Sequence, residues 1–284
     1  MRVLITGAGS YVGIHIAQWL HSKSDYQVET LDMMNDAWKD WNFKGYDVIF
    51  HVAGIAHRKA TPKNKELYFR VNRDLTFDVA QKAKENKIKQ FIYMSSMSVF
   101  HGEDIPFEQI ITPETPLYPT GYYGESKLQA ENLLLSLEDN TFKVCILRPP
   151  MIYGVGAKGN FPRLIKLASI TPIFPDFHNR RSMLYIDNLA EFVLQAIKHQ
   201  LNGIFYPQNR ELSDTVDIVR YFADVQKHPI RFWHSLNPLV RILCHILPPV
   251  NKMFGSYYYE PTMSKMDFDY QLVSFEESLK RIQS

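Results

Sequence analysis

The sequence predicts an α/β protein with a doubly wound parallel sheet and a smaller C-terminal domain. Short apolar runs alternate with amphipathic segments up to about residue 150, as is typical of parallel strands joined by right-handed helical crossovers. The first apolar run is followed at once by a glycine-rich turn. The chain has 284 residues, of which 45% are hydrophobic, so it is long enough for one large core with an appendage.

The first strand is expected at Arg2–Thr6, an apolar run too short for a helix. A glycine-rich turn and an amphipathic stretch, Ile14–Leu20, follow it. Backbone N–H groups at a helix start can face a pyrophosphate, and glycines let the phosphates approach closely. This order predicts a Rossmann dinucleotide site, although the same glycines could form an ordinary tight turn. The predicted cofactor contacts in the turn are Gly7, Gly9, Ser10, Tyr11, Val12 and Gly13.

The second strand is expected at Val28–Asp32 and ends in an acid 25 residues after Gly7. A carboxylate at this point can accept hydrogen bonds from the ribose diol and repel a 2′-phosphate. No Lys or Arg follows before Lys39, so NAD is favoured over NADP, with NADP still possible. Asp32 could also be a surface acid at a strand end.

Later segments divide the chain into two expected domains. Helices are expected at 65–86, 125–137 and 188–199, and a further strand at 203–206. Pro and Gly become frequent between 149 and 175, where we place the change of layer. Residues 1–155 should form the dinucleotide-binding domain, with 183–210 returning to it. Residues 156–182 and 211–284 should form the substrate-binding domain.

A candidate catalytic set follows from spacing. Tyr123 and Lys127 lie four residues apart, on one face of a helix, and Ser96 lies 27 residues before Tyr123. A lysine beside a phenol stabilises phenolate, and a serine hydroxyl can share the hydrogen bond to a reacting oxygen. Such a trio can take a proton from an alcohol as hydride leaves its carbon. The Tyr-x-x-x-Lys pair alone also occurs by chance on exposed helices.

The chain resembles the extended short-chain dehydrogenase/reductase superfamily, and within it the NAD-dependent nucleotide-sugar epimerase/dehydratase family. The branch it looks most like is the UDP-glucose 4-epimerase-like one of bacterial surface-polysaccharide synthesis. The resemblance runs through nearly the whole chain. It rests on six segments in the family's order: Thr6–Gly13, Asp47–Gly54, Arg70–Asn72, Phe91–Phe100, Leu147–Gly154 and Arg181–Ala190.

The resemblance implies further site residues and a homodimer. It implies that Ser96, Tyr123 and Lys127 are catalytic and that Tyr123 and Lys127 also contact the cofactor. Further implied cofactor contacts are Val52, Ala53, Gly54, Asn72 and Pro150. The implied substrate contacts are Ser96, Ser98, Lys158, Asn160 and Arg181, with Arg181 placed against the substrate diphosphate.

Departures from the family pattern narrow the expected reaction. Ser10 stands where the family has glycine, and only fourteen residues separate Asp32 from Asp47, too few for the usual helix and third strand. Either that unit is cut to a turn, or Asp32 does the work of the acid that usually follows the third strand. Met97-Ser98 replaces the acid pair of the 4,6-dehydratases, which counts against dehydration.

Three functions remain open. The first is a UDP-hexose 4-epimerase that uses NAD in surface-polysaccharide precursor synthesis. The second is an NAD(P)H-dependent reductase of a UDP-4-keto-N-acetyl-deoxyhexose. The third, of another class, is a non-catalytic NAD(P)-binding regulator; the presence of both Tyr123 and Lys127 argues against it.

Composition excludes several other classes. The net charge of +2 gives no nucleic-acid footprint. No apolar run reaches the roughly 20 residues of a membrane span, and the early glycines argue against a signal peptide, so we expect a cytoplasmic protein without stable membrane insertion. Cys145 and Cys244 are expected to be buried free thiols, and the ten histidines show no metal-ligand spacing.

Four remaining features keep two interpretations each. The apolar segment 236–254 could lie on a membrane surface, but its prolines favour a packed helix over the substrate cleft. Tyr257–Tyr259 could stack on a base or sugar ring, or pack in the core. His51 is expected to be a satisfied core histidine. His57 could reach the cofactor or sugar, or belong to a loop.

Overall fold

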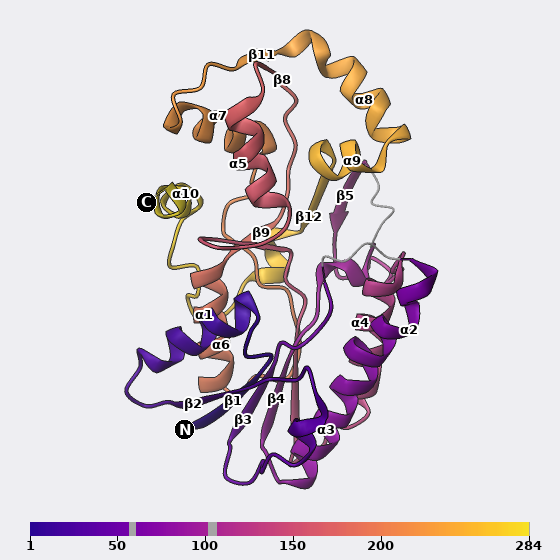
Figure 1. Ribbon diagram of the computed structural model, residues 1–284, viewed down its shortest axis with the longest axis vertical. Coiled ribbons are helices and arrows are strands. Elements are labelled where there is room, and N and C mark those ends of the chain that lie inside the picture. The colour runs from indigo at the N-terminus through magenta and orange to yellow at the C-terminus, as the bar shows by residue number, and fades with distance from the viewer. Residues whose placement is uncertain (57–60, 102–106, 284) are drawn as a thin grey trace.

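A six-stranded parallel sheet forms the centre of the larger lobe (Figure 1). The computed structural model describes residues 1–56, 61–101 and 107–283, so His57 lies outside the described residues. The strand order is β2-β1-β3-β4-β6-β10, and every neighbouring pair is parallel. The strands are β1 (Arg2–Thr6), β2 (Gln27–Leu31), β3 (Val48–His51), β4 (Gln90–Met94), β6 (Lys143–Leu147) and β10 (Gly203–Phe205). The predicted doubly wound fold is confirmed.

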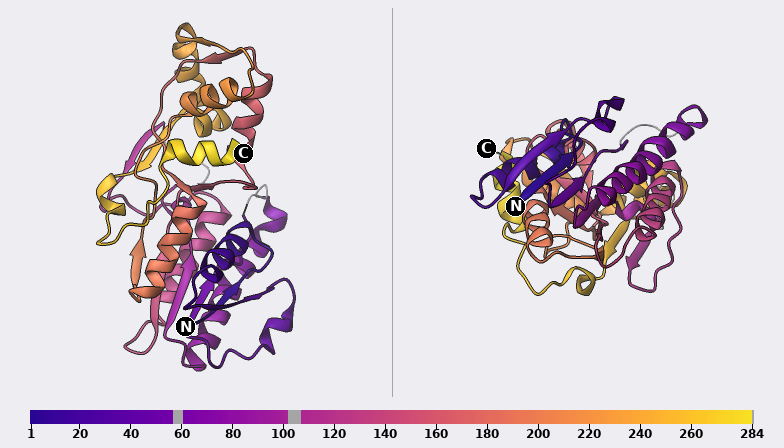
Figure 2. Two further views of the ribbon diagram at one scale, coloured as in Figure 1. Left: turned by 90° about the vertical axis from the view of Figure 1, so that its left-hand side faces the viewer. Right: turned by 90° about the horizontal axis from the view of Figure 1, so that it is seen from below.

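Helices cover both faces of this sheet (Figures 1 and 2). On one face α1 (Tyr11–His21) packs against α6 (Ile186–Lys198). The other face carries α2 (Lys65–Phe69), α3 (Leu75–Glu85) and α4 (Tyr122–Leu135). β1 lies between β2 and β3, so the chain leaves it in opposite directions along the sheet. The crevice beyond the carboxyl ends of strands at such a switch point is where ligands bind in these sheets.

Two segments differ from a regular helix-and-strand pattern. Between β2 and β3 only a short 3₁₀-helix forms, η1 (Asp36–Lys39), so the usual helix and third strand are cut to a turn. The helix expected over 65–86 is interrupted by a π-helical turn, η3 (Arg70–Asp74). Asn72 lies in this turn and is fully buried.

The second lobe lies above the carboxyl ends of the sheet (Figure 1). Its helices are α5 (Asn160–Ile170), α7 (Thr215–Val225), α8 (Asn237–Ile246), α9 (Pro248–Phe254) and α10 (Phe275–Gln283), with 3₁₀ turns η5 (His234–Leu236) and η6 (Pro261–Ser264). Three parallel pairs complete it: β5 (Glu108–Ile111) with β12 (Ser256–Tyr259), β7 (Met151–Tyr153) with β9 (Met183–Tyr185), and β8 (Ile173–Pro175) with β11 (Arg231–Trp233). Because β5 pairs with β12, part of the range 1–155 lies beside the C-terminal segments. The division into domains stays a prediction.

The structure also confirms expectations about single side chains and about helix length. Cys145 and Cys244 are buried free thiols. Tyr257 and Tyr259 are buried as well, so two of the three consecutive tyrosines pack in the core. Within the described ranges, the helices are all too short or too polar to cross a membrane.

His51 is the satisfied core histidine expected from the sequence. Its Nδ1 lies 2.7 Å from the hydroxyl of Thr6, and its Nε2 lies 3.1 Å from the hydroxyl of Thr76. Burial lowers the pKa of His51 to about 3, with the nearby charge of Lys127 acting in the same direction. The ring is therefore neutral in the folded protein across the physiological pH range.

This neutral ring predicts acid sensitivity. Below the ordinary histidine pKa of about 6.5 the unfolded chain binds a proton that folded His51 does not, so stability falls as pH falls from about 6.5 towards 3, by up to about 1.4 kcal/mol per pH unit. Urea unfolding across this range should show the slope. His51→Gln keeps a hydrogen-bonding side chain without the titration, and its slope should be shallower by that amount. An unchanged slope in the variant would contradict the assignment.

Candidate active site

The turn after β1 is held by its own backbone and by Ser10. The N–H of Gly7 donates to the carbonyl of Leu31 (2.8 Å), and the N–H of Ser10 donates to the carbonyl of Gly7 (3.0 Å). Ser10 caps α1: its Oγ accepts from the N–H of Gly13 at 2.9 Å. The serine in place of the family's glycine is thus a helix cap, and its N–H is already used within the turn. Helix geometry leaves the N–H groups of Tyr11 and Val12 without an intrahelical acceptor.

Three glycines of this turn are glycine for different reasons. Gly7 has φ +102°, and a Cβ there would come 2.8 Å from the backbone nitrogen of Ala53. A Cβ on Gly13 would come 2.7 Å from the carbonyl oxygen of Gly7. At Gly9 an added Cβ meets no atom of the described protein within 4 Å. Packing therefore requires Gly7 and Gly13, whereas Gly9 borders open space that fits an approaching phosphate.

The different surroundings of Gly7 and Gly9 predict different effects of alanine substitution at the two positions. Gly7→Ala should lower the free energy of unfolding by about 2 kcal/mol or more, because the backbone is strained and the new methyl meets the backbone of Ala53. Gly9→Ala should leave the stability of cofactor-free protein unchanged and weaken NAD binding. Thermal unfolding of both variants, with NAD titration by calorimetry, tests this. Equal losses of stability in the two variants would contradict it.

Asp32 and the loop after β3 lie on either side of the glycine turn. β2 and β3 are the two neighbours of β1. Asp32 follows β2 directly and is exposed, with one carboxylate oxygen accepting from the N–H of Met34 at 2.9 Å. Val52, Ala53 and Gly54 follow β3, and the N–H of Val52 donates to the carbonyl of Thr6 at 3.1 Å. The predicted ribose acid and the predicted cofactor loop thus share one edge of the sheet with the turn.

Asn72 holds the loop after β3 by hydrogen bonds to its backbone. Its Oδ1 accepts from the N–H of Ile55 (2.7 Å), and its Nδ2 donates to the carbonyl of Ile55 (3.1 Å) and to the hydroxyl of Ser126 (3.1 Å). A Cβ on Gly54 would lie 3.1 Å from Asn72 Oδ1 and 3.3 Å from Lys127 Nζ. All polar atoms of the Asn72 side chain are used within the protein, so we assign it a positioning role between the loop and α4.

Ser96 and Tyr123 are brought together by a close approach of two elements. Ser96 caps the short 3₁₀-helix η4 (Met97–Val99) and accepts from the N–H of Ser98 at 3.1 Å. A Cβ on Gly124 would collide with the carbonyl oxygen of Ser98, so glycine at this position lets α4 lie against η4. The hydroxyl of Ser96, which donates to that of Ser98 at 3.1 Å, lies near enough to the phenol of Tyr123 to lower its pKa.

The sequence predicts that Lys127 stabilises the phenolate of Tyr123, and the pKa shifts of the two groups differ from this expectation. Burial raises the pKa of Tyr123, and the nearby hydroxyl of Ser96 opposes that change. Burial also lowers the pKa of Lys127 to about 7, against the charge of Glu131. The ammonium of Lys127 donates to the carbonyl of Met94 at 2.7 Å. Burial, and not the charge of Lys127, therefore dominates the pKa of this phenol.

Sequence reasoning missed a buried ion pair on the same helix face. Glu131 follows Lys127 by one turn, and its carboxylate lies 2.6 Å from the guanidinium of Arg148; both side chains are at most 4% exposed. Glu131 also accepts a hydrogen bond from Ser95, next to Ser96. An acid at the eighth position after Tyr123 was the available signal, since 123, 127 and 131 share one helical face.

Arg181 carries an uncompensated charge. Its guanidinium is desolvated, which lowers its pKa to about 10. It donates to the carbonyl of Gly255 at 3.0 Å, and no carboxylate of the described residues lies within ion-pair distance of it. A half-buried cation without an ion-pair partner among the described residues favours an anionic ligand.

The remaining predicted residues are less closely tied to this centre. Ser98 accepts from the hydroxyl of Ser96 at 3.1 Å. Pro150 is buried beside Pro149, whose carbonyl accepts from the N–H of Met97 at 2.9 Å. Lys158 is exposed, and the amide oxygen of Asn160 accepts from Arg163 at 3.4 Å. The structure gives no contact of Lys158 or Asn160 with the catalytic trio among the described residues.

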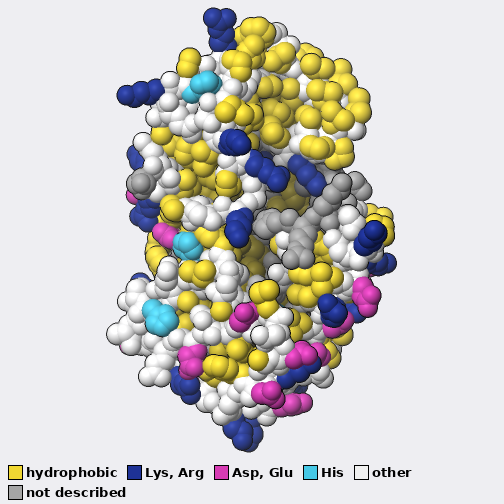
Figure 3. All heavy atoms as spheres, viewed as in Figure 1, with side chains coloured by type: hydrophobic (Ala, Val, Ile, Leu, Met, Phe, Trp, Pro, Cys, Tyr) yellow, Lys and Arg dark blue, Asp and Glu magenta, His cyan; other side chains and the backbone are white. Residues whose placement is uncertain are grey.

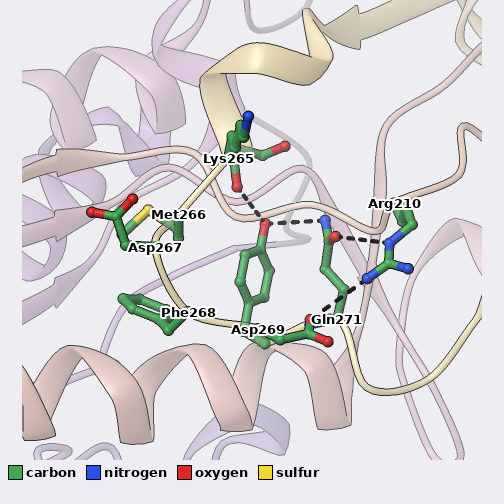
Figure 4. Close-up of a pocket in the computed structure, with 9 residues that line it drawn as sticks. Arg210, Lys265, Met266, Asp267, Phe268, Asp269 and Gln271 are labelled. Atoms are coloured by element: carbon green, nitrogen blue, oxygen red, sulfur yellow. Dashed lines mark hydrogen bonds and ion pairs between the residues drawn. The ribbon is translucent and has the colours of Figure 1, made fainter.

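Two other clusters are explained by their internal pairing. His178 lies 2.7 Å from Asp214, and Asp217 pairs with Arg220 at 3.3 Å, so these groups neutralise one another. A pocket is lined by Arg210 and residues 264–271 (Figure 4). There Gln271 donates to the hydroxyl of Tyr270 at 3.4 Å and accepts from Arg210 at 3.5 Å. Its polar groups thus hold the loop itself together.

Comparison with known proteins places this site in a family. The sequence model of the NAD dependent epimerase/dehydratase family matches residues 3–206. The chain belongs to this family. A UDP-glucose 4-epimerase of Vibrio cholerae is 30% identical over 279 residues, covering 89% of this chain and 82% of the relative. A 4-epimerase of Escherichia coli O157:H7 that is named for N-acetyl-α-D-glucosaminyl-diphospho-ditrans,octacis-undecaprenol is 25% identical, covering 71% of this chain and 65% of the relative.

Solved structures share the fold across the whole chain. The UDP-glucuronic acid 4-epimerase of Bacillus cereus in complex with NAD has a TM-score of 0.76 at 20% identity, covering 100% of this chain and 97% of that one. The described residues fit NAD: open space borders Gly9, two helix N–H groups face the turn, and the exposed carboxylate of Asp32 stands at the next strand. The cofactor of this epimerase/dehydratase enzyme is NAD.

Proposed function

We propose that this protein is a nucleotide-sugar 4-epimerase that acts on a UDP-hexose. The observation that carries the proposal is the approach of η4 and α4 that brings Ser96 near the phenol of Tyr123, on the same helix as the buried amine of Lys127. The half-buried guanidinium of Arg181, which has no carboxylate partner among the described residues, supports a substrate with a diphosphate. The relatives named as 4-epimerases support the position of the reaction on the sugar ring.

Each residue has a distinct task in this proposal. Bound NAD would supply reversible hydride transfer at C4 of the sugar. Tyr123 takes the proton of the 4-hydroxyl and gives it back, and Ser96 shares the hydrogen bond to that oxygen. Lys127, whose amine donates to the carbonyl of Met94, can gain or lose its proton near neutral pH because its pKa is about 7. Arg181 binds the diphosphate, and we propose Ser98, Lys158 and Asn160 as further substrate contacts.

A panel of UDP-sugars tests the proposal. Purified protein should contain bound NAD and should interconvert one C4-epimeric pair, which proton NMR resolves. Conversion of a 4-keto sugar only when NADPH or NADH is supplied would replace the epimerase with the reductase that the sequence also allows. Bound NAD without any turnover would favour a regulator. Homodimer formation and a cytoplasmic location belong to the proposal and need sedimentation and fractionation measurements.

A further inference from the structure

Helix α8 leaves an apolar stripe uncovered. It buries Val240 and Cys244 against the protein. On its other side Leu239, Ile242 and Ile246 are 52%, 57% and 65% exposed. These three residues follow the spacing of one helical face. Leu247 and Trp233 extend the exposed apolar surface, each 43% exposed. The helix is therefore only half packed, and the expectation that segment 236–254 is simply a packed helix is incomplete.

The chain segment that carries this stripe has charges of one sign. From Arg231 to Tyr259 the sequence contains no Asp or Glu, while it contains three Lys or Arg and two His. The basic side chains of the segment are all exposed: Arg231, His234, Arg241, His245 and Lys252. Figure 3 shows apolar side chains gathered over the region of α8, with Lys and Arg side chains along the edge that faces the central hollow.

An apolar stripe bordered by cations fits a particular partner. Amphipathic helices with basic borders bind the interface of bilayers that contain anionic lipids, the apolar residues entering the acyl boundary and the cations meeting the headgroups. A second copy of the same face would bring like charges together, which disfavours it. We propose that α8 docks this protein on the surface of an anionic membrane, without a membrane-spanning segment.

The docking face is connected to the candidate substrate site. Helix α9 (Pro248–Phe254) leads from α8 to Gly255, whose carbonyl accepts from Arg181 at 3.0 Å. A helix of this length spans about 10 Å. A bilayer seated on α8 therefore lies near the guanidinium proposed to hold the substrate diphosphate. The docking does not depend on the identity of that substrate.

Vesicle sedimentation tests the docking. Wild-type protein should pellet with vesicles of phosphatidylglycerol and phosphatidylcholine, less so at high salt, and stay in solution with phosphatidylcholine alone. Ile242→Asp/Ile246→Asp should reduce pelleting about tenfold or more. Leu272→Asp is the matched control, since Leu272 is 53% exposed and lies outside the stripe; it should pellet like wild type. Thermal unfolding and NAD binding should stay unchanged in the variants.

Three results would overturn the proposal. One is that wild-type protein fails to pellet with anionic vesicles. The second is equal pelleting of the double aspartate variant. The third is a wild-type dimer that the double variant converts to monomer, in the absence of vesicle binding, which would assign the stripe to a second copy of the chain. Light scattering after gel filtration measures this last outcome.

Discussion

Replacing Tyr123 with Phe should lower the turnover rate by about 10²–10⁴-fold, the range that a positioned proton-transfer group supplies. The ring keeps its packing, and only the hydroxyl near Ser96 is lost. NAD content after purification should therefore stay unchanged. Initial rates with the substrate found in the UDP-sugar panel, together with cofactor content by absorbance after denaturation, measure both quantities.

The neighbouring phenol provides a control for this substitution. Tyr122 begins α4, and the ammonium of Lys65 lies 5.6 Å from the centre of its ring. Tyr122→Phe removes the same atom one residue away and should keep full turnover. Equal activity of the Tyr123 variant and wild type, or equal losses in both variants, would contradict the proposed role.

Breaking the Glu131–Arg148 pair should be the most destabilising polar change near the site. Glu131→Gln leaves the guanidinium of Arg148 buried without its partner, and such a loss costs about 3–5 kcal/mol. Glu29→Gln, which breaks the exposed pair of Arg2 and Glu29 at 2.8 Å, should cost less than about 1 kcal/mol. Urea unfolding of both variants gives the comparison, and similar costs would contradict the buried role.

The same pair should also influence catalysis through Lys127. The charge of Glu131 raises the pKa of Lys127 against the effect of burial. Its removal should shift the pH at which activity changes with Lys127 to a lower value, because the ammonium loses the negative charge that stabilises it. Arg148→Met combined with Glu131→Gln should recover much of the lost stability while leaving this shift in place. A pH–rate profile identical to wild type would rule out the electrostatic contribution.

The larger lobe could be predicted because its signals are local. Short apolar runs, the glycine turn and the amphipathic helix after it are each read from adjacent residues, and the sheet follows from their alternation. The π-turn at Arg70–Asp74 could not be predicted, since one extra residue in a helix barely changes the apolar periodicity. The pairing of β5 with β12 joins segments of only four residues each that lie far apart in the sequence.

The sequence predicted some residues of the candidate site and missed others. Ser96, Tyr123 and Lys127 follow from spacing and from resemblance, and the structure brings the first two close enough for Ser96 to lower the pKa of Tyr123. Glu131 was missed because an acid in a helix usually reads as a solvent-exposed residue. The hydrogen bonding of Arg181 could not be predicted either, since Gly255 is 74 residues away and contributes only a backbone carbonyl.

The fate of the C4 hydrogen tests the central claim most directly. A UDP-hexose carrying deuterium at C4 should yield the C4 epimer with the deuterium still at C4, in protein that receives no added cofactor. Proton and deuterium NMR of the product reads this result. Failure to form the epimer, or an epimer whose C4 label has exchanged with solvent, would contradict an oxidation and return reduction carried out around Ser96, Tyr123 and Lys127.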